Sequence, residues 1–259
     1  MIGTSLLGML LALAPFASAE TIVPRQECVV LLHGLWRTEL SMMAVEWELD
    51  EAGYTVANVT YPSLLYPIQE LAEMAVEEGI HECREEGLSR IHFVTHSLGG
   101  ILVRQYLENR DIAGLERVVM MGPPNQGSQM ADFVHSLEML HPLEPQAIAQ
   151  LTTGEKSVPL QLGPVDFELG VIAGNVNRRP PLPGVPDEAS DGTVAVTETM
   201  VPGMVDFVEL PASHTFMMWN PDVLAQVLYF LEHGRFDHPD QESTPSEVAP
   251  LSLAPESSD

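Results

Sequence analysis

Stretches of continuous apolar residues alternate along the chain with stretches in which apolar positions recur every three or four residues. The first pattern predicts strands buried on both faces, and the second predicts amphipathic helices. The expected strands cover 28–32, 54–61, 91–95, 118–121, 167–173 and 205–210, and the expected helices cover 39–52, 68–86, 98–109 and 221–232. Strands that alternate with helices favour right-handed βαβ connections. We therefore expect an α/β fold with a mostly parallel central sheet and helices on both faces.

Two later segments do not follow this alternation. Residues 128–164 carry several prolines and apolar side chains that the sheet does not require, and they predict a short helical insertion. The insertion could be an ordinary packed element or a small lid over a site. Residues 237–259 contain six acidic residues and four prolines but no Lys or Arg, which predicts a disordered acidic tail.

The first nineteen residues have no charged side chain, an apolar centre at 6–13, and the sequence Ala17-Ser18-Ala19 at their end. This pattern predicts a signal peptide over 1–19 with an A-x-A cleavage site. A retained membrane anchor is the alternative, although the apolar part is short for a bilayer. We expect an exported protein, periplasmic or extracellular, whose folded domain covers 20–236.

The chain has two cysteines, Cys28 and Cys83. Export would place them in an oxidising compartment, where an even pair favours a disulfide. Cys28 opens an expected strand and Cys83 lies near the end of the helix that leads to the next central strand. A disulfide and a pair of buried thiols are both compatible with these positions.

Length and charge limit the partners. A chain of 259 residues is long enough for one large α/β domain. Its 37 acidic residues outnumber 11 basic ones, so the formal net charge is −26. Nucleic acids and anionic membrane surfaces are therefore unfavourable partners, and the acidity is typical of a solvated surface. The acidic residues show no spacing typical of metal ligands, and the oligomeric state is not predicted.

One candidate for chemistry is the sequence T-H-S-L-G-G at 95–100, where Ser97 stands between an expected strand and an expected helix. A serine at this place can be a nucleophile exposed on a sharp turn. Gly99 suits such a turn because the backbone segments come too close for a side chain. The helix that begins at Leu98 directs its N–H groups toward a developing oxyanion. The alternative is that Ser97 only caps that helix.

A nucleophilic serine needs a base, and the base needs a group that orients it. Asp191 follows the expected strand 167–173, and His214 follows the strand 205–210. The order Ser, Asp, His is the order that this architecture requires. Asp191 could instead be a turn residue, in which case Asp187 would replace it. His96 is expected to pack or to form a local hydrogen bond rather than to act as the base.

Five segments together resemble the α/β-hydrolase superfamily, in particular small bacterial secreted lipases and esterases. They are V-V-L-L-H-G-L (29–35), T-H-S-L-G-G (95–100), G-P-P-N-Q-G-S (122–128), S-D-G-T-V (190–194) and S-H-T-F (213–216). The resemblance implies Ser97 as the nucleophile, His214 as the general base and Asp191 as the acid that orients it. It also implies an oxyanion hole formed by the backbone N–H groups of Leu35 and Leu98. We expect no cofactor.

These observations predict a serine hydrolase that cleaves carboxylic esters through an acyl-enzyme. Apolar residues near the motifs favour lipid or fatty-acyl esters, with Trp36 and Met217 as candidate substrate-binding residues. The expected partners are a small-molecule or lipid ester and, at most, a transient lipid interface. A thioesterase or an acyltransferase would use the same three residues. A binding protein that has kept the hydrolase shell without catalysis is the alternative outside the enzymes.

Overall fold

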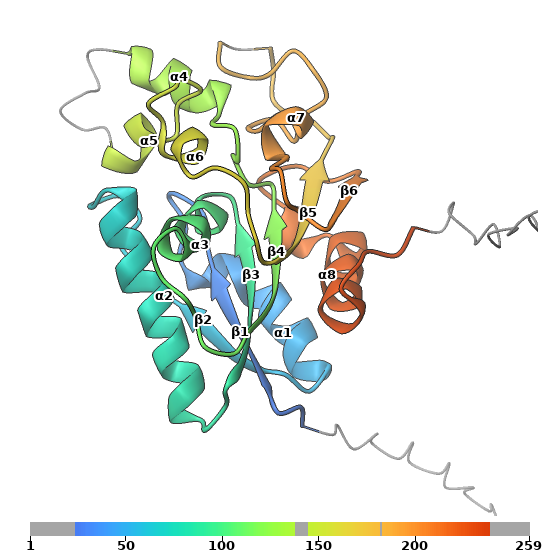
Figure 1. Cartoon of the computed structure of the whole chain (residues 1–259). Helices are drawn as coiled ribbons and strands as arrows, with labels where there is room; N and C mark the ends of the chain where they lie inside the picture. Colours follow the sequence, from blue (N-terminus) through green and yellow to red (C-terminus); the bar gives the residue numbers. More distant parts are fainter. Residues whose placement is uncertain (1–23, 138–144, 182, 239–259) are drawn as a thin grey trace, which may run out of the picture.

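We analysed a computed structural model of the chain, which describes residues 24–137, 145–181 and 183–238 (Figure 1). The expected signal peptide and the tail from residue 239 onward lie outside the described residues. None of the helices in these described ranges combines the length and apolar character needed to cross a membrane.

The centre of the fold is a six-stranded sheet in which every neighbouring pair of strands is parallel. The strand order is β2-β1-β3-β4-β5-β6. The strands are β1 (Glu27–Leu32), β2 (Thr55–Val59), β3 (Arg90–His96), β4 (Leu115–Met121), β5 (Glu168–Gly174) and β6 (Asp206–Leu210). The prediction of an α/β fold with a parallel central sheet is therefore confirmed.

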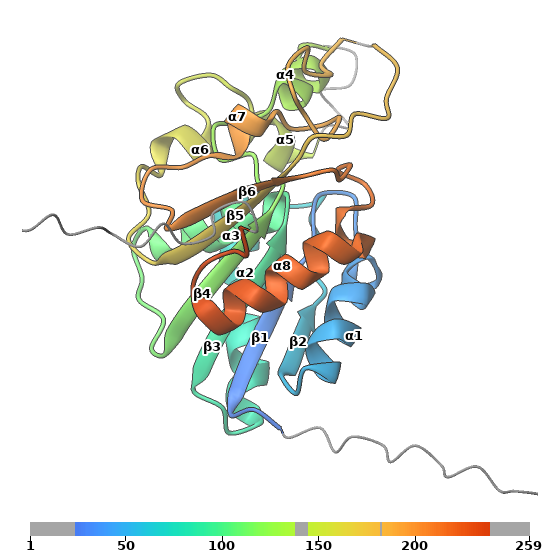
Figure 2. The ribbon, with the colours of Figure 1, turned by 90° about the vertical axis from the view of Figure 1, so that its right-hand side faces the viewer.

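Helices cover both faces of the sheet, which explains why its central strands are apolar at successive positions. On β1, Val30 and Leu32 contribute to one buried cluster, whereas Val29 and Leu31 contribute to the other. The first cluster contains side chains of α2 (Ile68–Glu85) and α3 (Leu98–Leu107). The second contains side chains of α1 (Met43–Glu51) and α8 (Pro221–His233). Figures 1 and 2 show these two pairs of helices on opposite sides of the sheet.

The residues at the ends of two expected helices show how each helix begins or ends. The helix expected over 39–52 begins as a 3₁₀ turn, Glu39–Met42, and becomes α-helical at Met43. In α8 the side chain of Asn220 accepts a hydrogen bond from the Asp222 N–H, and Gly234 ends the helix with φ of 69°. The expected closing helix thus has a cap at each end.

The expected insertion contains three short helices, α4 (Gln129–Ser136), α5 (Gln146–Gln150) and α6 (Val158–Gln161). A fourth, α7 (Val196–Thr199), follows β5. In Figure 1 these helices lie together beyond the carboxyl ends of the strands. In an open α/β sheet this is the edge at which ligands bind. Whether the insertion moves as a lid stays a prediction.

Cys28 and Cys83 form a disulfide that joins the start of β1 to the last turn of α2, with a Cα–Cα distance of 5.7 Å. The bond spans 55 residues of sequence. It lies at the end of the sheet opposite the carboxyl ends of the strands. Disulfides are typical of proteins outside the cytoplasm, so the bond suggests such a location.

Candidate active site

Ser97 is the single residue between β3 and α3, and its backbone has an unusual positive φ of 54° with ψ of −119°. Such a conformation costs about 1–3 kcal/mol for a residue with a side chain and occurs mainly at functional sites. The turn depends on Gly99, because a Cβ there would lie 2.5 Å from the carbonyl oxygen of Leu32. The close approach of α3 to β1 therefore requires a glycine and leaves the Ser97 hydroxyl on the outside of the turn.

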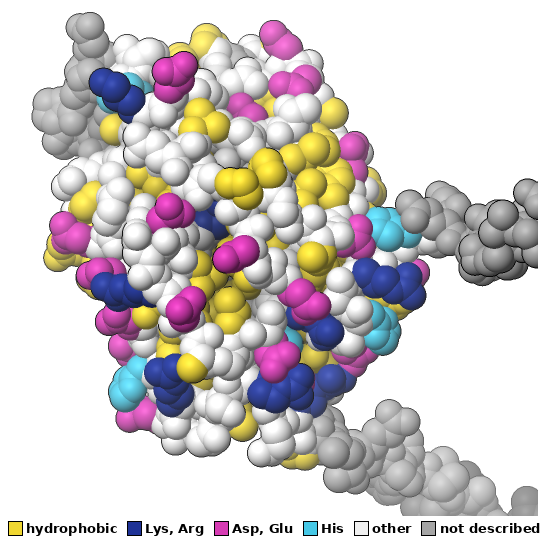
Figure 3. All heavy atoms as spheres, in the orientation of Figure 1, with side chains coloured by type: hydrophobic (Ala, Val, Ile, Leu, Met, Phe, Trp, Pro, Cys, Tyr) yellow, Lys and Arg dark blue, Asp and Glu magenta, His cyan; other side chains and the backbone are white. Residues whose placement is uncertain are grey.

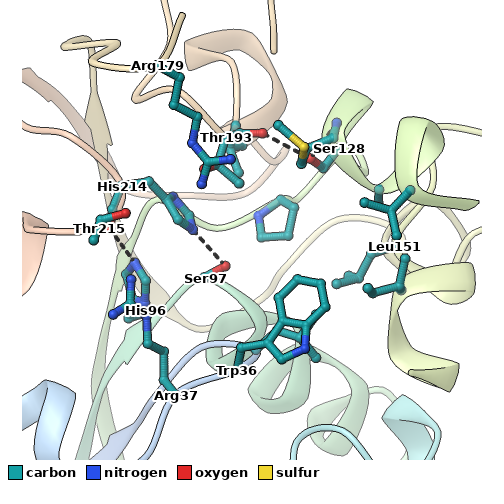
Figure 4. Close-up of a pocket in the computed structure, with 17 residues that line it drawn as sticks. Trp36, Arg37, His96, Ser97, Ser128, Leu151, Arg179, Thr193, His214 and Thr215 are labelled. Atoms are coloured by element: carbon teal, nitrogen blue, oxygen red, sulfur yellow. Dashed lines mark hydrogen bonds between the residues drawn. The ribbon is translucent and has the colours of Figure 1, made fainter. Parts of the chain in front are cut away.

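The three residues proposed as a catalytic set form one hydrogen-bonded chain. The Nε2 atom of His214 lies 3.1 Å from the Oγ atom of Ser97, and its Nδ1 atom lies 2.6 Å from Oδ2 of Asp191. Figure 4 shows the His214 ring pointing toward Ser97. Ser97 and His214 are 117 residues apart in sequence, so the fold brings them together. This geometry allows proton transfer from the hydroxyl to His214 while Asp191 orients the ring.

The Asp191 carboxylate is held by its own loop. Its Oδ1 atom accepts hydrogen bonds from the N–H groups of Thr193 (2.9 Å) and Val194 (2.8 Å), which leaves Oδ2 for His214. The Asp191 carbonyl oxygen also accepts a hydrogen bond from the His214 N–H at 3.0 Å. Asp187, the alternative acid, is exposed and forms none of these contacts.

His96 forms a hydrogen bond to the backbone of His214. Its ring is buried, and its Nε2 atom donates a hydrogen bond to the carbonyl oxygen of His214 at 3.0 Å. Burial, followed by the charges of His214 and Arg37, holds the pKa of His96 well below its usual value. His96 therefore stays neutral and fixes the backbone of the loop that carries His214.

The loop after β1 approaches Ser97 from the other side. The carbonyl oxygen of His33 accepts a hydrogen bond from the Tyr61 hydroxyl, and the His33 ring stacks on Tyr61 with ring centres 4.0 Å apart. The N–H of Leu98 is in the first position of α3 and has no acceptor within the helix. Leu35, the other expected oxyanion donor, lines the pocket next to Ser97. This arrangement is compatible with an oxyanion hole built from the two N–H groups.

Ser97 and His214 open into a cavity of about 370 Å³, a size suited to a small substrate. Most of its wall is apolar. The apolar residues come from the loops after β1, β4 and β5 and from the insertion: Leu35, Trp36, Pro124, Met130, Ala131, Val134, Ile148, Leu151 and Val194. Trp36 thus lies where a substrate would bind. Met217, the other candidate substrate-binding residue, is fully buried and does not line the cavity, because its side chain packs in the core.

The charged residues of this cavity, Arg37 and Arg179, were among those that the sequence did not point to. Arg37 directly follows the apolar sequence H-G-L-W, and its charge stands out in a chain with few basic residues. Arg179 belongs to a proline-rich loop with no motif, so only the fold could reveal its place. Across the described ranges, no group of three or more His, Cys, Asp or Glu side chains is arranged to hold a metal ion.

A family model described as the alpha/beta hydrolase family matches residues 29–235, so the chain belongs to this family. No curated protein matches the chain. The structure resembles that of the Bacillus licheniformis lipase BlEst2 in its mature form, with a TM-score of 0.64 and 18% identity, over 83% of this chain and 95% of that one. It also resembles Aspergillus fumigatus lipase B (TM-score 0.56, 15% identity, 83% of this chain and 55% of that one).

A third solved structure, the metagenomic carboxyl esterase MGS0156, has a TM-score of 0.55 and 18% identity over 73% of this chain and 64% of that one. At these identities the similarity establishes the shared hydrolase fold. The assignment of an activity therefore depends on the residues of this chain.

Proposed function

We propose that the protein is a serine hydrolase that cleaves carboxylic esters with an apolar acyl chain. The observation that carries the proposal is the hydrogen-bonded chain from Ser97 through His214 to Asp191 at the wall of a largely apolar cavity. The lipase and esterase neighbours are consistent with it. The disulfide supports the further proposal that the protein is exported.

In the first half of the reaction, the Ser97 oxygen forms a bond to the ester carbonyl carbon while Nε2 of His214 takes the hydroxyl proton. The negative charge moves to the former carbonyl oxygen, where the N–H groups of Leu35 and Leu98 stabilise it. The bond to the alcohol then breaks, and His214 gives its proton to the departing alkoxide. An acyl group remains on Ser97.

In the second half, a water molecule attacks the acyl carbon while His214 takes a proton from it. The bond to Ser97 breaks, His214 returns the proton to the serine oxygen, and the carboxylic acid leaves. Asp191 orients His214 and stabilises its charged form in both halves. The apolar wall supplied by the insertion fits the acyl chain.

Hydrolysis of p-nitrophenyl esters of increasing chain length by the purified protein tests the proposal. We expect kcat/KM to rise with chain length as more apolar surface is buried, and to fall by several orders of magnitude in Ser97→Ala. Ser89→Ala is the matched control, because Ser89 is exposed and does not line the cavity. Equal rates for the wild type and Ser97→Ala would contradict the proposal, and transfer to an added alcohol instead of hydrolysis would indicate an acyltransferase.

A further inference from the structure

The cavity has a second chemical character besides its apolar wall, because two arginine side chains line it. Arg37 is half-buried and follows Trp36 in the loop after β1, and Arg179 is exposed in the loop after β5. Figure 4 shows Arg179 reaching toward His214 from one side and Arg37 lying beside His96 on the other. Two positive charges therefore flank the site at which an ester would react.

Neither guanidinium has an ion-pair or hydrogen-bond partner among the described residues, and the surface residues Arg84, Arg178 and Arg235 share this feature but do not line the cavity. Four other arginines pair with glutamates, namely Arg25, Arg90, Arg110 and Arg117. Arg104 is buried and donates to backbone carbonyls and to Asn125. Asp187 lines an adjoining hollow with Arg179 but does not form an ion pair with it.

The rest of the protein is strongly acidic, in contrast to the two positive charges at the cavity. The chain carries a formal charge of −26, and Figure 3 shows acidic side chains scattered over one face of the molecule. In this acidic chain, Arg37 and Arg179 are the two arginines that line the cavity beside Ser97 and His214. Two unpaired guanidiniums at the mouth of one cavity leave donors available for an anion, and guanidinium forks match the oxygens of phosphate well.

The two arginines lie on other sides of Ser97 than Trp36 and Leu151. In Figure 4, Trp36 and Leu151 lie to the right of Ser97, Arg37 lies to its left beside His96, and Arg179 lies above it next to His214. The hydrogen bonds of Asp191 go to its own loop and to His214, and its carboxylate forms no ion pair with either arginine. An ester bound across Ser97 would thus have its acyl chain against apolar residues and its alcohol part near two positive charges.

From this geometry we propose that the preferred substrates are carboxylic esters whose alcohol part carries an anionic group, best matched by a phosphate, which Arg37 and Arg179 bind. The inference rests on the proposed ester hydrolysis and specifies the substrate class. The bond cleaved remains the carboxylic ester, and the phosphate leaves unchanged on the alcohol. Arg37 and Arg179 act as specificity-determining residues and take no proton.

The test compares two esters that differ only in the anion, 1-octanoylglycerol and 1-octanoylglycerol 3-phosphate, each below its aggregation concentration, with release of octanoate as the readout. We expect the wild type to have a kcat/KM about tenfold higher for the phosphate-bearing ester, the size of effect of one charge-assisted contact. The preference should shrink as salt is added.

The double variant Arg37→Ala/Arg179→Ala should lose this preference. Arg84→Ala/Arg178→Ala is the matched control, because it removes the same charge from exposed residues that do not line the cavity. Arg179→Glu provides a second test, because Arg179 is exposed and the substitution should not disturb folding. Arg178→Glu is its matched control. We expect Arg179→Glu to favour the neutral ester.

The outcomes separate this inference from the proposed function. Hydrolysis of both esters with equal kcat/KM, or an unchanged preference in Arg37→Ala/Arg179→Ala, would overturn the anion preference and leave the esterase proposal standing. Hydrolysis of neither ester by the wild type would contradict the esterase proposal and the inference with it.

Discussion

The Nε2 atom of His96 donates a hydrogen bond to the main-chain carbonyl oxygen of His214 over 3.0 Å. A carbonyl oxygen can only accept, so the proton of His96 lies on Nε2. The contact links the residue before the nucleophile to the residue proposed as the base. His96 is therefore a positioning residue whose effect on the reaction passes through His214.

We expect His96→Leu to lower kcat by about tenfold with little change in KM, because it removes a buried hydrogen bond that holds the His214 loop. His96→Gln should recover part of the loss, since its amide N–H can reach the same carbonyl. Steady-state kinetics of both variants provide the check. An equal loss in the two variants would show that the ring's packing, rather than this hydrogen bond, is what matters.

Asp191→Asn should lower kcat by about four orders of magnitude, because an amide can stabilise the wrong tautomer of His214 and cannot stabilise its charged form. Asp187→Asn is the control, since Asp187 is the other acid that the sequence offered. A large loss in Asp187→Asn with a small one in Asp191→Asn would reassign the orienting acid.

Gly99→Ala is expected to destabilise the fold by more than 1 kcal/mol and to reduce activity, because the new Cβ would lie 2.5 Å from the Leu32 carbonyl oxygen. Gly154→Ala is the matched control, since a Cβ there meets only the Thr152 Oγ1 at 3.9 Å. Urea unfolding of the two variants measures the difference. Similar stabilities would mean that the turn relaxes more easily than its contacts imply.

Loss of the disulfide should lower the free energy of unfolding by about 4 kcal/mol, the value of the chain-entropy model for a 55-residue interval. The measurement is urea unfolding with and without reductant. Cys28→Ala/Cys83→Ala should be less stable than the wild type without reductant, and its stability should not respond to reductant. Wild-type stability that does not respond to complete reduction would contradict this role for the bond.

Acid should destabilise the protein partly through His92. Burial lowers the pKa of this ring to about 4, and its Nδ1 accepts a hydrogen bond from the Arg117 N–H. Glu116 raises the pKa, and Arg117, Arg90 and Arg25 lower it. The Glu27 carboxylate also faces the ring, with Oε2 3.7 Å from Nε2. The folded state resists protonation of His92, so stability is complete above about pH 6.5 and falls as the pH drops toward 4.

We expect His92→Gln to flatten this fall without abolishing it, because burial also lowers the pKa values of His33 and His96. Unfolding free energies measured every half unit between pH 4 and 7 provide the test. A pH dependence identical to that of the wild type would show that His92 protonates as readily in the folded protein as in the unfolded chain.

Much of the sheet could be predicted because continuous apolar runs give a clear signal for buried parallel strands. The run at 28–32 became Glu27–Leu32, whereas the strand expected at 118–121 begins earlier, at Leu115. Its first three residues are only half-buried, so they break the apolar pattern that the prediction relied on. The short helices of the insertion carried no such periodic signal.

The residues of the candidate site also fall into two groups, those that the sequence predicts and those that depend on the fold. Ser97, Asp191 and His214 each follow a recognisable strand. Because sites in parallel sheets form at the carboxyl ends of the strands, these residues could be expected to lie close together. The contact between His96 and His214 depends on packing between segments 118 residues apart. The places of Arg37 and Arg179 depend on how two loops fold over the cavity, which no local pattern encodes.

The central claim is that Ser97 is an activated nucleophile, and labelling with a fluorophosphonate followed by peptide mass spectrometry tests it most directly. The account predicts one phosphonylated peptide, containing Ser97, that is absent from Ser97→Ala and present in Ser89→Ala. A folded wild-type protein that forms no adduct at Ser97 would contradict the account.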